Sequence, residues 1–151
     1  MLSAWQKFVA ILNKWRWKAV DTDKVYGYQC VDWVKQFAFE QYGVTLKSFS
    51  WSALRWWLTW SPFDSTWQRI DYKPWRIPEI WDIVFLNNTL SNPYWHVCVA
   101  DNHCDYRTLH VIEQNAGSGN GSWKWTNAIR QSAFPYQNSG RWNCLGWFHR
   151  K

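Results

Sequence analysis

The chain has 151 residues, 47% of them hydrophobic, and a formal net charge of +6. This length suits one domain with a buried core, and the composition excludes a disordered chain. The positive charge favours a polyanionic partner such as nucleic acid, an anionic membrane or an acidic cell-wall polymer. Since the chain has no dense Lys/Arg tract and no nucleic-acid motif, we expect no specific nucleic-acid partner, and a merely soluble basic surface explains the charge as well.

Three helices are predicted in the first 60 residues. The first follows Ser3, an N-cap candidate, and has apolar side chains at helical spacing: Phe8, Ile11, Leu12 and Trp15. The second covers residues 30–42 and ends at Gly43, with one apolar face made of Cys30, Trp33, Val34, Phe37 and Ala38. The third covers residues 50–60.

Short β-type runs separated by turn residues follow the helices. They are residues 82–86, 96–100, 108–113, 128–134 (the weakest) and 145–149. Helices first and strands afterwards predict an α+β fold with N-terminal helices packed on an antiparallel sheet. No linker or repeat divides the chain, so we expect one domain over residues 1–151. The order of the strands in the sheet cannot be read from these patterns.

The only apolar run near the N-terminus is "FVAIL", residues 8–12, and Asn13 and Lys14 follow it. This run is too short for a signal peptide or a membrane span. We therefore expect synthesis in a cytoplasm, no membrane span, and release by another component if the protein acts outside the cell.

A cysteine-dependent site is one interpretation of the segment "VYGYQCVDW", which places Cys30 at the start of the second predicted helix. A helix N-terminus favours the thiolate, which is the reactive form of cysteine. A nucleophilic cysteine also needs a histidine and a group that orients it. His96 begins one predicted strand and Glu113 ends the next, so their side chains meet if the two strands are neighbours. Asn115 shares a face with Glu113 if that strand continues far enough.

The alternative interpretation is an inert core cysteine and a histidine at a strand end. A zinc site is a weaker alternative, because its candidate ligands match no common zinc spacing and would occupy His96. Those candidates are His96, Cys98, His103, Cys104 and His110. We therefore interpret Cys98 as a core strand residue, and His103 and Cys104 as part of a turn. The irregular spacing of the four cysteines does not favour a disulfide framework.

The order of several motifs resembles that of the CHAP family, the cysteine, histidine-dependent amidohydrolase/peptidase domains. The motifs are "YGYQCVDWV", "WDIVF", "WHVCVA", "VIEQNAGSGNG" and "LGWFHR", which span about residues 21–149. The resemblance implies a papain-like α+β fold and cleavage of amide bonds in bacterial peptidoglycan. We also expect a single catalytic domain, without a separate wall-binding domain.

Carried over by position, the resemblance implies that Cys30 is the nucleophile and His96 the general base. Glu113 resembles the residue that orients the histidine, and Asn115 a supporting polar group. The Cys30 backbone N–H, with the Gln29 side chain, would stabilise the oxyanion. Gln29 fits a surface position equally well.

Two tryptophans depart from the family pattern. The family usually has glycine at the positions of Trp81 and Trp95. Trp95, beside His96, must either turn away or form a wall of the substrate cleft. Both tryptophans are therefore candidates for lining a substrate groove.

Three carboxylates precede or follow Cys30 closely. Counted from Asp21, they occupy positions one, three and twelve: Asp21, Asp23 and Asp32. Calcium prefers such hard oxygen ligands, and the spacing resembles the start and end of an EF-hand loop, although Tyr26 takes the place of the usual glycine. The alternative is a solvated acidic loop with Asp32 in the first helical turn.

Some CHAP domains carry a calcium site just before the nucleophile. By position, the backbone carbonyls of Val25 and Gly27 would join the three aspartates there. The resemblance therefore implies a structural Ca²⁺ that braces the loop holding Cys30.

The resemblance also implies a phage endolysin or a virion-associated lysin with peptidoglycan as its partner, released by a holin or attached to a virion. The bond cut is either the muramoyl–alanine amide or a peptide bond, because groove shape decides specificity. The alternative is a non-catalytic module. With 16 tryptophans, such a module would offer an aromatic groove for glycan, peptide or single-stranded nucleic acid.

Overall fold

The computed structural model describes residues 1–47, 52–88, 94–115, 128–137 and 142–151. Its helices are α1 (Ala4–Trp15), α2 (Cys30–Tyr42) and α3 (Ala53–Thr59). Its strands are β1 (Trp67–Asp71), β2 (Ile83–Asn88), β3 (His96–Ala100), β4 (Thr108–Glu113), β5 (Arg130–Pro135) and β6 (Trp142–Arg150). The predicted α+β fold is confirmed, with the helices preceding the strands along the chain.

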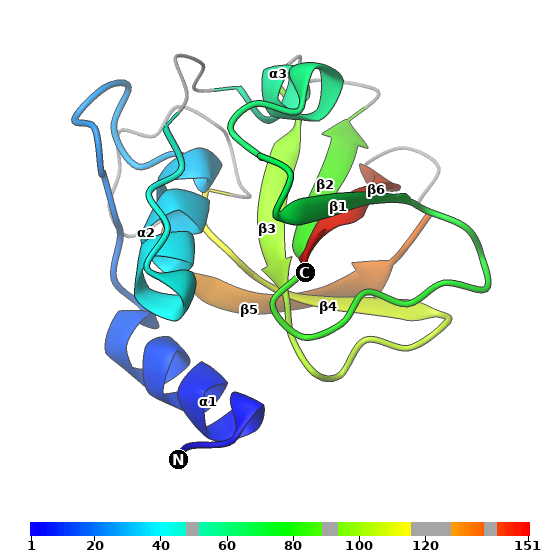
Figure 1. Cartoon of the computed structure of the whole chain (residues 1–151), viewed down its shortest axis with the longest axis horizontal. Coiled ribbons are helices and arrows are strands. Elements are labelled where there is room, and N and C mark those ends of the chain that lie inside the picture. Colours follow the sequence, from blue (N-terminus) through cyan, green and yellow to red (C-terminus); the bar gives the residue numbers. More distant parts are fainter. Residues whose placement is uncertain (48–51, 89–93, 116–127, 138–141) are drawn as a thin grey trace.

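The six strands form one sheet in the order β1-β6-β2-β3-β4-β5, and every neighbouring pair is antiparallel (Figure 1). Strand β6 therefore lies between β1 and β2, although it is the last strand of the chain. Helix α2 packs beside β3, and α3 lies over one end of β2 and β3. This arrangement brings the N-terminus of α2 to the sheet.

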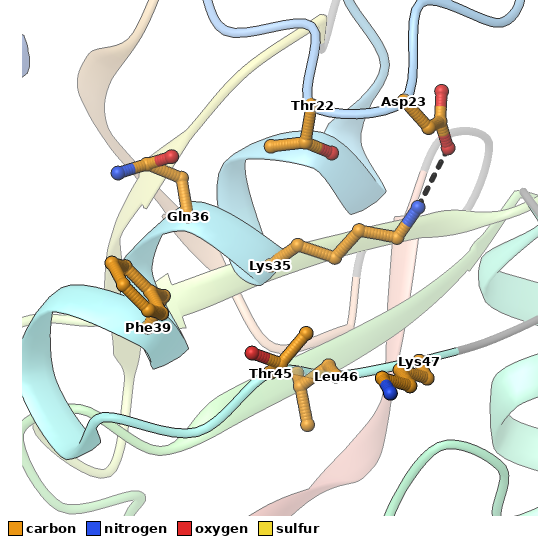
Figure 2. Close-up of a pocket in the computed structure, with 8 residues that line it drawn as sticks. All are labelled: Thr22, Asp23, Lys35, Gln36, Phe39, Thr45, Leu46 and Lys47. Atoms are coloured by element: carbon orange, nitrogen blue, oxygen red, sulfur yellow. Dashed lines mark hydrogen bonds and ion pairs between the residues drawn. The ribbon is translucent and has the colours of Figure 1, made fainter.

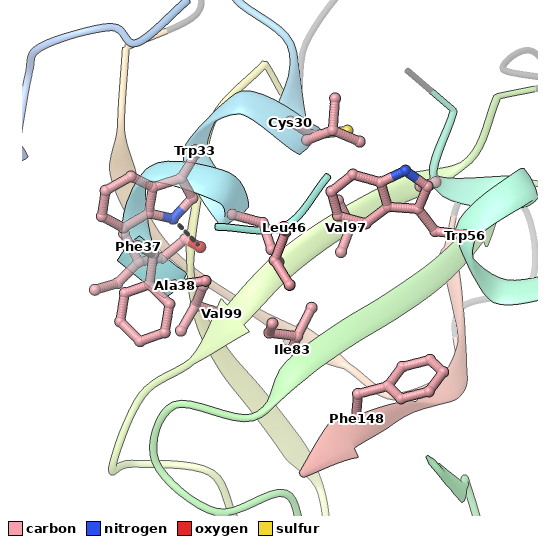
Figure 3. Close-up of a cluster of buried hydrophobic side chains, with 14 of the residues drawn as sticks. Cys30, Trp33, Phe37, Ala38, Leu46, Trp56, Ile83, Val97, Val99 and Phe148 are labelled. Carbon is pink, nitrogen blue, oxygen red and sulfur yellow. Dashed lines mark hydrogen bonds between the residues drawn. The ribbon is translucent and has the colours of Figure 1, made fainter. Parts of the chain in front are cut away.

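Helix α2 is placed by the apolar face that its sequence predicts. Cys30, Trp33, Val34, Phe37 and Ala38 are all buried. The helix ends at Gly43, whose left-handed backbone (φ 66°) lets its N–H donate to the carbonyls of Ala38 and Phe39. Figure 3 shows this face against the sheet.

Both faces of the sheet are buried. In β3, Val97 and Val99 belong to the larger cluster on the α2 side, whereas Cys98 and Ala100 belong to a second, smaller cluster. Alternation along a strand gives this division. Since strand β3 is buried along its whole length, any polar side chain on it needs a partner.

The boundaries of some elements differ from those predicted. Strand β1 was not predicted, because only its first residue is buried and its sequence lacks an alternating apolar pattern. Strand β6 begins three residues before the predicted 145–149 run. Helix α3 covers less than the predicted 50–60, and residues 50 and 51 lie outside the described ranges.

The tryptophans divide between core and surface. Trp33, Trp56 and Trp147 are fully buried. Four others are among the exposed large hydrophobic residues: Trp5, Trp17, Trp60 and Trp75. In the described ranges, no helix combines the length and the apolar character needed to cross a membrane.

Gly146 allows a close approach between β6 and β1. Its φ is 145°, and an added Cβ would lie 2.1 Å from the carbonyl oxygen of Ile70 and 2.9 Å from a ring carbon of Trp57. We expect Gly146→Ala to lower the free energy of unfolding by roughly 3 kcal/mol, which corresponds to a fall in Tm of about 6–12 °C.

Gly43→Ala is the matched control, because Gly43 also has a positive φ but no atom lies within 4 Å of its added Cβ. Only the left-handed backbone penalty of about 1 kcal/mol applies there. Thermal melts of the two variants measure the difference. Equal melting temperatures would contradict the close approach at Gly146.

Candidate active site

The N-terminus of α2 presents Cys30 as its first residue, next to the N-cap Gln29. The Asp32 carboxylate accepts a hydrogen bond from the Gln29 backbone N–H at 3.0 Å, which stabilises this end of the helix. Cys30 is 8% exposed. The thiol therefore lies at the positive end of a helix dipole, within the protein rather than on its surface.

His96 and Glu113 meet across two neighbouring strands, as predicted. Because Val99 pairs with Ile112 and Ala100 with Val111, extending the β3–β4 register places Glu113 opposite Cys98. His96 is then the diagonal neighbour of Glu113, within side-chain reach. The His96 Nε2 atom lies 2.9 Å from Glu113 Oε2, and both side chains are buried.

Cys30 is the other group that acts on His96, because its side chain contributes to the raised pKa of the imidazole. Nε2 faces Glu113, which leaves Nδ1 as the ring nitrogen available to a further partner. Burial lowers the pKa of His96, but the hydrogen bonds and charges of Cys30 and Glu113 outweigh it and raise the pKa overall. These two neighbours thus favour a protonated imidazole between the Cys30 sulfur and the Glu113 carboxylate.

Strand β5 holds the other oxygen of Glu113, which the sequence did not indicate. The Ser132 hydroxyl donates to Oε1, and Arg130 Nε lies 3.6 Å from the same atom. Burial raises the pKa of Glu113, but His96, Ser132 and Arg130 together lower it below its usual value. The carboxylate therefore stays charged, and its orientation is set from two strands.

Trp142 on β6 is a further neighbour that sequence reasoning missed. Its ring centroid lies 5.2 Å from that of His96, with the planes tilted by 39°. Only the pairing of β6 beside β2 brings it there, so no local pattern could have identified it.

Asn115 lies near the helix N-terminus, but not as a continuation of the strand. Strand β4 ends at Glu113, and Asn115 has a left-handed backbone (φ 57°). Its Nδ2 donates to Gln29 Oε1 at 2.9 Å, and Gln29 Nε2 donates to the Tyr26 carbonyl at 2.6 Å. The condition for a shared face of Glu113 and Asn115 is therefore not met, because the strand ends at Glu113 and the chain turns after it. Asn115 contacts Gln29 instead.

Trp81 and Trp95 both have left-handed backbones, with φ of 81° and 62°. Glycine adopts this conformation without strain, which explains why it suits both positions. Trp81 lies at the end of the sheet remote from His96, because its N–H donates to the Ala100 carbonyl at the other end of β3. A groove role for Trp81 stays a prediction at that end of the sheet, whereas Trp95 directly precedes His96.

The three predicted aspartates gather at the N-terminal end of α2. Oxygen atoms of Asp21, Asp23 and Asp32 lie within 4.8 Å of one another, and the described residues contain no other such group of three His, Cys, Asp or Glu side chains. Asp21 Oδ1 is buried without a hydrogen-bond partner among them. Thr22 donates to Asp32 at 2.6 Å, and Lys35 forms an ion pair with Asp23 at 2.7 Å. A buried, unpartnered oxygen among hard ligands fits a Ca²⁺ ion.

Backbone geometry turns this loop sharply. Tyr26 and Gly27 both have left-handed φ values, 62° and 70°. The Val25 N–H donates to Asp23 Oδ1 at 2.9 Å. Burial raises the pKa of Asp32, and the charge of Asp23 raises it further. A cation would relieve the repulsion between the Asp23 and Asp32 carboxylates. Ligation by the Val25 and Gly27 carbonyls stays a prediction.

The Lys35–Asp23 ion pair lines a cavity of about 450 Å³ (Figure 2). Residues of α2 and of the segment 45–47 line it, and its lining includes neither Cys30 nor His96. The cavity is therefore separate from the Cys–His pair.

The four cysteines are all free. Cys98 is a buried strand residue and Cys104 lies in the connection between β3 and β4, as predicted. Burial raises the pKa of Cys104 and of Cys144 to about 12, and raises that of Cys98 well above its ordinary value. Among the described residues, these three thiols resemble inert core groups.

Comparison with known proteins finds no matching family model and no matching curated protein. The fold is similar to that in the crystal structure of a wild type endolysin, LysIME-EF1, with a TM-score of 0.68 and 19% sequence identity. The match covers 94% of this chain and 62% of that one. At this identity, the similarity establishes the fold.

Alkylation by iodoacetamide tests the Cys30–His96–Glu113 chain directly. At neutral pH we expect Cys30 to react at least about tenfold faster than the other three cysteines, because only it is paired with a protonated histidine. Glu113→Gln removes the charge that raises the pKa of His96, so the Cys30 rate should fall roughly tenfold per pKa unit lost. Peptide mass spectrometry measures each site separately.

Glu79→Gln is the control, because Glu79 is an exposed carboxylate remote from His96. The alkylation rate of Cys30 in this variant should equal that in the wild type. A Cys30 that reacts no faster than Cys104 would contradict the pairing with His96.

Proposed function

We propose that this protein is a peptidoglycan hydrolase that cleaves an amide bond by cysteine nucleophilic catalysis, as the CHAP resemblance implies. The observation that carries the proposal is the buried His96–Glu113 pair with Cys30, the first residue of α2, as the other group that acts on His96. The similarity in fold to an endolysin supports the same substrate class.

The first step is acylation of the cysteine. The Cys30 sulfur, its proton held by His96, attacks the carbonyl carbon of the scissile amide, and the carbonyl electrons move onto its oxygen. The Cys30 backbone N–H at the helix terminus stabilises that oxyanion, with the Gln29 side chain as a second candidate. The C–N bond then breaks as His96 donates its proton to the leaving amine, and Cys30 is left as a thioester.

The second step is hydrolysis of the thioester. His96 removes a proton from water, the resulting hydroxide attacks the thioester carbon, and the Cys30 sulfur leaves and recovers its proton. Glu113 stabilises the protonated imidazole in both steps, while Ser132 and Arg130 hold the carboxylate. Asn115 supports this arrangement through its contact with Gln29.

The substrate bond is either the N-acetylmuramoyl-L-alanine amide or a peptide bond of the stem or cross-bridge. Either fits the chemistry, because groove shape selects the bond. The net charge of +6 favours an anionic cell envelope. We propose a role as a phage endolysin released by a holin, or as a lysin carried on a virion.

Loss of Cys30 or His96 should abolish hydrolysis. On purified peptidoglycan, we expect Cys30→Ala and His96→Ala to release new amino groups at least about 1,000-fold more slowly than the wild type. Mass spectrometry of the soluble products measures this release and also identifies the bond cut.

Cys104→Ala is the matched control, since Cys104 is a thiol outside the proposed mechanism and should leave the rate unchanged. Co-sedimentation with peptidoglycan separates catalysis from binding. Equal binding by wild type and Cys30→Ala, with no product from either, would favour the non-catalytic aromatic module. Product release that survives Cys30→Ala would remove Cys30 as the nucleophile.

We also propose a structural Ca²⁺ site formed by Asp21, Asp23 and Asp32, with the Val25 and Gly27 carbonyls as further ligands. The close carboxylate oxygens and the unpartnered Asp21 Oδ1 support it. When bound, the ion would neutralise the carboxylates and brace the loop before Cys30. Lys35 would have to release Asp23 or share it.

Calcium should stabilise the fold. At a free concentration of 100 times Kd, we expect a gain of about 2.7 kcal/mol, so EGTA should lower Tm by about 5–10 °C and added Ca²⁺ should restore it. Asp21→Asn should lose this response, while Asp71→Asn, which alters a surface carboxylate paired with Arg69, should keep it. A wild-type Tm that is the same with and without EGTA would refute the Ca²⁺ site.

A further inference from the structure

Gln114 is a fully buried side chain with no role in the mechanism above. Its Nε2 donates to the carbonyls of Val20 at 2.7 Å and Gln29 at 2.8 Å, and its Oε1 accepts from the Val20 N–H at 2.7 Å. One side chain therefore joins the end of β4 to two segments. One is Val20, just before the loop that carries Asp21 and Asp23, and the other is Gln29, the residue before Cys30.

These three bonds determine the orientation of the Gln114 amide. Val20 presents both an N–H and a carbonyl to it, and Gln29 presents a carbonyl. A flipped amide would place its oxygen against two carbonyl oxygens and leave a buried N–H of Val20 without an acceptor. The donors of Gln114 must therefore point at Val20 and Gln29.

The bond to Gln29 also determines the direction of the Cys30 N–H. The Gln29 carbonyl and the Cys30 N–H belong to one peptide unit, which is planar and trans. Holding the carbonyl oxygen therefore holds the N–H on the opposite side of the same plane. The Asp32 N–H donates to the same oxygen at 3.1 Å, so two donors hold this peptide plane.

We propose that Gln114 is a positioning residue that aims the Cys30 N–H at the oxyanion, through the Gln29–Cys30 peptide plane. The inference rests on the proposed function, in which this N–H stabilises the tetrahedral intermediate. Because Val20 directly precedes Asp21, the Gln114 amide also links the loop that carries Asp21 and Asp23 to the Gln29–Cys30 peptide plane.

The test compares two reactions of Cys30. In p-nitrophenyl acetate, the sulfur bonds to the acetyl carbon, an oxyanion forms, and nitrophenolate leaves to give an acetyl thioester. In iodoacetamide, the sulfur displaces iodide and no oxyanion forms. A residue that acts through the oxyanion donor affects the first reaction selectively, whereas damage to the Cys30–His96 pair slows both.

Two variants remove the bond to Gln29. Gln114→Met has similar size and loses all three bonds, while Gln114→Glu keeps an acceptor for the Val20 N–H. We expect the nitrophenolate burst, corrected for Cys30→Ala, to slow about 10- to 100-fold in each, with alkylation within about twofold of wild type. Circular dichroism and Tm first establish that each variant is folded.

Gln137→Met is the matched control. Gln137 Nε2 also donates to a backbone carbonyl, that of Cys144 at 3.2 Å, and that carbonyl does not belong to the Gln29–Cys30 peptide unit. Both reaction rates should stay at their wild-type values. A folded Gln114 variant whose acylation is unchanged, or falls only in step with alkylation, would overturn the inference.

Hydrogen exchange in the wild-type protein provides a measurement that needs no variant. The side-chain amide protons of Gln114 should exchange at least about 100-fold more slowly than those of Gln137, because they are buried and bonded. Equal exchange would overturn the inference. If the wild type is acylated by p-nitrophenyl acetate but releases no amine from peptidoglycan, the proposed function is wrong. The ratio of acylation rate to alkylation rate in the Gln114 variants still tests the role of Gln114.

Discussion

The hydrogen bond between His96 and Glu113 depends on one register between β3 and β4. A shift of one residue would turn every side chain of a strand to the other face, and the pair would separate. Packing of Val97 and Val99 in the larger cluster opposes such a shift, since the shift would move both side chains to the other face of the sheet and leave their places in that cluster unfilled. The same packing seats α2 beside β3, and so sets where Cys30 meets His96.

Burying this pair has a cost that the surrounding groups offset. Removing a carboxylate and an imidazolium from water is unfavourable unless they bond to each other and their other atoms find partners. Ser132 and Arg130 satisfy the second oxygen of Glu113, and Trp142 covers the imidazole ring. The partners that compensate for burial of His96 and Glu113 therefore come from the sheet itself.

Short polar contacts also join the loop before α2 to the site. Asp32 caps the helix through the Gln29 N–H and binds Thr22, while Gln114 holds Val20 and Gln29 together. Any cation held by the aspartates would therefore act on a segment that is bonded to the residue before Cys30. Stability of the loop and geometry of the thiol are coupled through these bonds.

The sequence by itself determined the elements whose signals are local: the apolar face of α2 and its end at Gly43, the strands 96–100 and 108–113, and the close spacing of three aspartates around the start of α2. It also placed Cys30, His96 and Glu113 at the ends of elements, where side chains can converge. Only the tertiary structure decided the strand order, the edge strand β1, and the contacts of Ser132, Trp142 and Gln114. Periodicity reports which face of an element is buried, but a strand's partner depends on distant residues, and these contacts exist only once that pairing forms.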